Sequence, residues 1–68
     1  MKTLITDVDL LAAALTQARV TVYEKDGRIA DYGGVLEKYT PESVKIAGTY
    51  FMREVYVFKT GSARERSE

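Results

Sequence analysis

The chain has 68 residues, no histidine and no cysteine, and its ten basic and ten acidic residues give a formal net charge of zero. These absences remove the usual general base, the strongest nucleophile and the usual metal ligands, and they exclude disulfide bonds. The charge balance argues against a non-specific nucleic-acid binder, because neutralisation of phosphates supplies most of that affinity.

A helix is the first element that the sequence predicts. Thr6 can accept a hydrogen bond from the backbone amide of Asp9, and Asp9 is a shorter substitute for the glutamate of a capping box. Ile5 and Leu10 stand where a hydrophobic staple would pack. The cap and the helix dipole explain Asp7 and Asp9 better than a metal ion does.

The predicted helix is apolar on more than one side. Strong helix formers fill the run from Leu10 to Ala18. An apolar stripe at helical spacing consists of Val8, Leu11, Ala12, Leu15 and Ala18, and Leu10 and Ala14 widen it. We therefore expect the helix to contact both its own sheet and a neighbouring molecule.

Two strand-like runs joined by a tight turn follow the helix. The apolar period changes to two, so that Val20 and Val22 face the same way. Asp26-Gly27 is a strong hairpin signal. The second run, Ile29 to Tyr39, is interrupted by Gly33-Gly34, and paired glycines inside a strand mark a bulge or a sharp bend.

The rest of the chain predicts two or three further short strands. Ser43 to Ala47 forms the third strand, with Val44 and Ile46 facing inward, and Ala47-Gly48 forms the next turn. Thr49 to Thr60 supplies one long strand or two short ones. We expect residues 1–60 to form a single domain and the polar tail 61–68 to be disordered.

Three segments resemble known motifs. Val20 to Arg28 is similar to the opening of the first Sm motif, Gly34 to Tyr39 to its later Gly-x-Leu segment, and Phe51-Met52-Arg53 to the Ile-Arg-Gly of the second motif. On these residues the chain resembles the Sm-like family, which includes bacterial Hfq and the archaeal and eukaryotic Sm proteins. The resemblance implies an N-terminal helix before a bent five-stranded barrel, and RNA binding by an oligomeric ring.

The chain also departs from the family pattern. Asp31-Tyr32 are extra residues between the two glycine segments, Thr40 stands where the motif has an aspartate, and Glu54 replaces the glycine after the arginine. The base-contacting asparagine of the motif has no counterpart. The resemblance therefore supports the architecture more than the RNA pocket.

The predicted fold class is α+β, mainly β. An N-terminal helix precedes a small, strongly bent antiparallel sheet of four or five strands, which forms a partly open barrel of the Sm-like or SH3-like kind. A lone core in so short a chain supplies only about 3–5 kcal/mol, so we expect a homo-oligomer. The apolar runs are too short to span a bilayer and Met1-Lys2-Thr3 lacks the apolar stretch of a signal peptide, so we expect a cytoplasmic location and no membrane partner.

A few side chains are candidates for partner binding. Tyr32, beside the glycine pair, should be displayed at a bend, and we predict that it binds a partner together with Tyr39 and Arg53. Tyrosine also suits half-buried strand positions, which is the alternative explanation for this residue type. The charged pair Arg53-Glu54 either breaks a strand or lies at a subunit contact, and we favour the contact.

The sequence thus favours a non-enzymatic interaction and assembly domain. It would self-associate through its sheet edges and the helix's second apolar face, and a protein partner is compatible with this hypothesis. The alternative is an Sm-like RNA-binding protein that stacks bases in a ring, with Tyr50, Lys38 and Lys45 as RNA contacts. We predict no catalytic, cofactor-binding or metal-binding residue, no cofactor and no small-molecule substrate.

Overall fold

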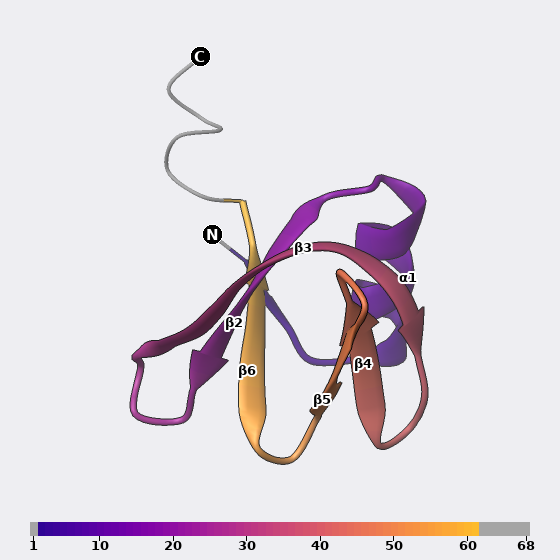
Figure 1. The fold of residues 1–68 in the computed structure, drawn as a ribbon. Helices are drawn as coiled ribbons and strands as arrows, with labels where there is room; N and C mark the ends of the chain where they lie inside the picture. Colours follow the sequence, from indigo (N-terminus) through magenta and orange to yellow (C-terminus); the bar gives the residue numbers. More distant parts are fainter. Residues whose placement is uncertain (1, 62–68) are drawn as a thin grey trace.

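The computed structural model describes residues 2–61, which form one helix and six strands (Figure 1). In chain order these are β1 (Lys2–Leu4), α1 (Asp7–Leu15), β2 (Arg19–Glu24), β3 (Ile29–Tyr39), β4 (Ser43–Ile46), β5 (Thr49–Met52) and β6 (Tyr56–Thr60). The mainly β class is confirmed, but the described part has six strands rather than four or five, because β1 precedes the helix. The predicted tail lies, apart from Gly61, outside the described residues.

The strands form one bent antiparallel sheet in the order β1-β6-β2-β3-β4-β5. β1 and β5 are its two edges, so the sheet is not closed. The long strand β3 pairs with β2 through its first part and with β4 through its last part, and Figure 1 shows it arching across the molecule between them. No helix in the part of the chain that the structure describes has the length and apolarity needed to cross a membrane.

The bend in β3 lies at the glycine pair, as predicted. Val20 pairs with Gly34 and Val22 with Asp31, so β3 carries an extra residue between these positions. Gly33 sits there with φ +70°, and a β-carbon on it would overlap the backbone carbonyl of Val20. The backbone amide of Gly33 donates to Oδ1 of Asp31 over 2.7 Å, which stabilises the bulge. Asp31 and Tyr32 therefore lie in the bulged part of β3.

One apolar core lies inside the bend. The helix packs against β3, and every described element contributes a side chain to the core. The core residues are Leu4, Leu10, Ala13, Val20, Val22, Leu36, Val44, Ile46, Phe51 and Phe58. The predicted faces of the first and third strand-like runs are confirmed, because Val20 and Val22 point the same way into the core and Val44 and Ile46 face inward, all almost fully buried.

The helix packs against the sheet with the face opposite to its main apolar stripe. Leu10 and Ala13 are buried, whereas Val8, Leu11 and Leu15 are 73%, 45% and 74% exposed. The small side chain of Ala13 lets the helix lie close to the sheet, and one leucine suffices to fill the space beneath it. The larger stripe is therefore left facing solvent.

Two details of the helix ends also differ from expectation. Ile5 is 72% exposed, so it does not form the predicted staple with the buried Leu10. The helix ends at Leu15 rather than continuing to Ala18, because Gln17 adopts φ +55° and the amide of Ala18 donates to the carbonyl of Ala13. This pattern is a Schellman motif, which ends a helix by satisfying its last carbonyl groups.

The turn between β4 and β5 offers a stability test. Ala47 and Gly48 have φ +50° and +83°, which makes this two-residue loop a type I′ turn. Because an L-residue in the left-handed region costs about 1–2 kcal/mol and asparagine tolerates it best, we predict that Ala47→Asn stabilises the fold by about 0.5–1 kcal/mol. Urea denaturation measures the change. The matched variant Ala30→Asn, on an exposed position of β3, should not stabilise, and an equal gain there would contradict the turn argument.

Candidate functional site

The register of the last strands brings the three predicted RNA contacts together. Lys38 on β3 lies opposite Lys45 on β4, and Lys45 lies opposite Tyr50 on β5. Directly opposed residues of an antiparallel sheet point to the same side. These three residues, which we call the lysine–tyrosine row, therefore form one continuous strip on the outer face of the sheet.

The lysine–tyrosine row combines positive charge with an aromatic ring. The Lys45 ammonium lies 5.5 Å from the ring centroid of Tyr50 and 3.9 Å from Oε1 of Glu37. Tyr50 is 57% exposed, and Met52, two residues along the same strand, is 49% exposed. The row can therefore offer an aromatic platform beside two cations, of which Glu37 partly neutralises one.

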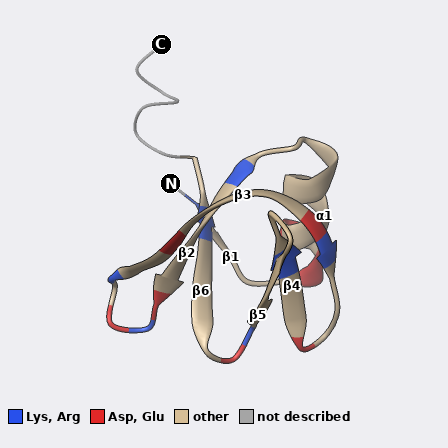
Figure 2. Ribbon diagram, viewed as in Figure 1, with Lys and Arg blue, Asp and Glu red and all other residues tan. Residues whose placement is uncertain are grey.

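Charge elsewhere on the molecule is mixed rather than concentrated. Figure 2 shows basic and acidic residues interspersed over the strands and turns. The Arg28 guanidinium, for example, pairs with Asp26 at 2.8 Å and with Glu24 at 3.8 Å across the β2–β3 turn. Such exposed pairs contribute little to stability, but they leave no extended basic face on the part of the chain that the structure describes.

Tyr32 lies apart from the lysine–tyrosine row. It belongs to the part of β3 that pairs with β2, next to the Gly33 bulge, and its side chain is 70% exposed. Its predicted display at a bend is confirmed. Whether it binds a partner stays a prediction.

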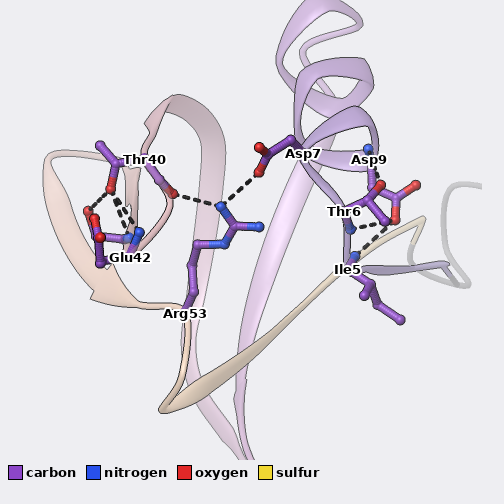
Figure 3. A network of polar contacts seen from close by, with 8 residues as sticks. Ile5, Thr6, Asp7, Asp9, Thr40, Glu42 and Arg53 are labelled. Atoms are coloured by element: carbon purple, nitrogen blue, oxygen red, sulfur yellow. Dashed lines mark hydrogen bonds and ion pairs between the residues drawn. The ribbon is translucent and has the colours of Figure 1, made fainter.

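The other two predicted partner-binding residues make internal contacts. Tyr39 is partly buried and packs against the core. The Arg53 side chain is 19% exposed, and its Nη1 donates to Oδ1 of Asp7 over 2.9 Å and to the carbonyl of Thr40 over 2.7 Å (Figure 3). Arg53 thereby joins the β5–β6 turn to the start of the helix and to the β3–β4 turn. Arg53 therefore lies beside the β3–β4 turn that follows Tyr39, whereas Tyr32 belongs to the first part of β3.

The charged pair Arg53-Glu54 ends a strand. Met52 is the last residue of β5, Tyr56 the first of β6, and the amide of Val55 donates to the carbonyl of Met52 in the turn between them. Of the two interpretations of this pair, the strand break is confirmed. The subunit contact stays a prediction.

The helix start shows the predicted cap. The amide of Asp9 donates to Oγ1 of Thr6, while Oδ2 of Asp9 accepts from the amides of Ile5 and Thr6 (Figure 3). These backbone hydrogen bonds, assisted by the Lys2 ammonium, lower the pKa of Asp9 to about 2. Because the folded pKa is below the unfolded one, the cap stabilises the fold above about pH 4 and this contribution is lost as pH falls toward 2. Among residues 2–61 no group of three or more acidic side chains could hold a metal ion.

The outer face of α1 is formed by most of the apolar stripe that the sequence indicated, and it faces solvent rather than the sheet. It consists of Val8, Leu11, Ala12 and Leu15, all exposed. The helix's two charged residues, Asp7 and Asp9, are held in ion pairs with Arg53 and Lys2. The signal was present, since seven of the nine helix residues are apolar, more than one buried face requires.

Comparison with models of protein families, with curated proteins and with solved structures found no match for this chain. Two exposed surfaces are available for a function, the uncharged outer face of α1 and the lysine–tyrosine row.

Proposed function

We propose that this chain is a non-enzymatic interaction domain that assembles with copies of itself through the outer face of α1. The observation that carries this proposal is the exposure of Val8, Leu11 and Leu15 on a helix face without charge. Contiguous exposed apolar surface of this kind marks interaction sites in soluble proteins. The small size of the domain adds to the need for a partner.

A second copy fits this face well. The three large side chains are spaced i, i+3 and i+7, which is the pattern of a helix–helix seam. An antiparallel pair would place Leu11 against its own counterpart, oppose the two helix dipoles favourably and let the small Ala12 permit close approach. The chain's zero net charge adds no long-range repulsion between copies.

The expected affinity is moderate. Each large aliphatic side chain contributes about 1.5–3 kcal/mol when it becomes fully buried, and association costs about 4–15 kcal/mol in lost freedom and ordering. Three such side chains from each copy therefore leave a small surplus. We expect a dimer whose free energy of association lies between about −4 and −8 kcal/mol, which corresponds to a dissociation constant between about 1 mM and 1 μM.

Leu11→Glu tests the proposal. Sedimentation over a wide concentration range should show the wild-type chain shifting toward twice its mass, and Leu11→Glu should remain monomeric throughout. Leu11 is outside the core, so thermal stability should change little. Met52→Glu, on β5 and similarly exposed, is the control and should still dimerise. A monomeric wild type would overturn the proposal, and association lost only in Met52→Glu would place the interface at the sheet edge instead.

A second candidate function is favoured by the lysine–tyrosine row. The Sm-like resemblance implies RNA binding, and the register places Lys38, Lys45 and Tyr50 on one strip. Stacking of a base on tyrosine and contact of phosphates with lysine are the usual means of holding a single strand. This second proposal includes the assignment of the bent sheet to the Sm-like type of barrel.

Binding of a fluorescent oligo-U or oligo-A strand tests the second candidate. Because base stacking on an aromatic ring contributes about 1–3 kcal/mol, Tyr50→Ala should weaken binding by at least about fivefold. Tyr32→Ala, an exposed tyrosine outside the row, should leave it unchanged. Binding should also weaken as salt rises, since phosphate contacts release counterions. No binding at low salt would remove RNA as a ligand.

A further inference from the structure

A pocket of about 330 Å³ lies between the end of β1, the first turn of α1 and β6. Its floor is formed by the core side chains Leu4, Leu10 and Phe58, and Ile5 and Val57 line its wall. This volume is at the low end of the range for small-molecule sites, which are mostly apolar with a few polar groups. The sequence did not predict a cleft, because the lining residues come from five separate segments.

The charged groups of this pocket are all cationic. Lys25, from the β2–β3 turn, and Arg53, from the β5–β6 turn, both line it, and no lining residue is acidic. Within residues 2–61 Lys25 forms no ion pair. The Arg53 guanidinium donates from Nη1 to Asp7 and to the Thr40 carbonyl (Figure 3), and within residues 2–61 its Nε and Nη2 make no hydrogen bond.

An apolar floor with cations at the rim has one matching ligand class. An aliphatic chain would gain from contact with the leucine and phenylalanine side chains, and a negative head group would gain from the uncompensated ammonium of Lys25. A neutral chain would lack the second contribution, and a cationic head would be repelled.

We propose that this pocket binds a small amphiphilic carboxylate, with its chain on Leu4, Leu10 and Phe58 and its carboxylate beside Lys25 and Arg53. The site lies apart from the outer face of α1 and from the lysine–tyrosine row. It therefore does not depend on either proposed function.

A titration of the ¹⁵N-labelled full chain with three ligands of equal chain length tests the proposal. Octanoate should shift the backbone amide resonances of Thr3, Leu4, Ile5 and Val57 saturably, octan-1-ol should bind more weakly, and octylammonium should not bind there. Equal shifts from all three ligands would overturn the proposal, because the head group would then not be recognised. Octanoate shifts centred on Val8, Leu11 and Leu15 would overturn it as well, since they would report adsorption to the helix.

Lys25→Ala provides the second test. Lys25 is exposed and lies in a turn, so the variant should fold as the wild type does. Octanoate affinity should fall by about fivefold, the effect of one partly solvated charge pair, while octan-1-ol affinity stays unchanged. The matched variant Lys38→Ala removes the same charge outside the pocket and should bind octanoate normally. Equal losses in both variants would reduce the effect to net charge and overturn the assignment.

Discussion

Gly33→Ala is expected to leave most of the chain unfolded at 25 °C. A β-carbon at this position would overlap the backbone carbonyl of Val20, and φ at Gly33 is +70°, a region that costs other residues about 1–2 kcal/mol. The overlap is with backbone, so only a shift of β2 or of the bulge can relieve it. A domain of this size has a free energy of unfolding of only about 3–5 kcal/mol. The overlap and the positive φ together therefore cost nearly as much as the fold has to lose.

Two glycine controls separate the causes of this effect. Gly34→Ala would place its β-carbon 3.4 Å from that of Ala47, with no positive φ, and should fold with a loss below about 1 kcal/mol. Gly27→Ala has φ +98° but open space around it, so it should lose about 1–2 kcal/mol from the backbone alone. Urea titration followed by circular dichroism gives the free energy of unfolding of each of the three variants. A Gly33→Ala chain as stable as Gly34→Ala would refute the close approach of β2 and β3.

The same glycine pair shows what the sequence can predict. A bend at Gly33-Gly34, a turn at Ala47-Gly48 and a cap at Thr6 all depend on residues close together in the chain, and all are present. Local conformational preferences decide such features, because a few residues supply both the strain and its relief. The inward faces of β2 and β4 followed from alternation for the same reason.

Features that depend on distant parts of the chain were missed or inverted. β1 contains only three residues, and Lys2 to Leu4 form a strand because β6, more than fifty residues later, pairs with them. The helix is apolar on two sides, so periodicity alone does not say which side meets the sheet. Leu10 and Ala13 face inward because the neighbouring strands leave room there for one large and one small side chain.

The candidate surfaces likewise combine features that the sequence predicts with features that depend on distant parts of the chain. The residue types of the lysine–tyrosine row were predicted, but their alignment depends on the register of β3, β4 and β5, which shifts between Leu36 and Lys38. One residue more or less in that bulge would turn Lys38 to the other face. Arg53 shows the opposite case, since its residue type suggested a surface contact and its surroundings turned it inward.

Arg53→Met should destabilise the fold by about 2–3 kcal/mol, because hydrogen bonds from a charged group contribute about 1.5–3 kcal/mol and the Thr40 carbonyl loses its donor. Asp7→Asn should cost less than about 1 kcal/mol, since the carboxylate is 66% exposed and the arginine keeps its second acceptor. The two losses, measured by urea denaturation, therefore indicate which acceptor matters more.

Lys45→Met is the matched control, because it removes one cation whose two partners, Glu37 and the Tyr50 ring, are exposed, and which makes no hydrogen bond to the backbone in the described residues. It should change stability by less than about 0.5 kcal/mol. If Arg53→Met did not change stability but sedimented at a lower mass than the wild type at the same concentration, Arg53 would be a subunit contact rather than an internal contact. We expect the opposite result. The free energy of unfolding of Arg53→Met should fall, while its folded fraction should still dimerise, because the outer face of α1 is intact.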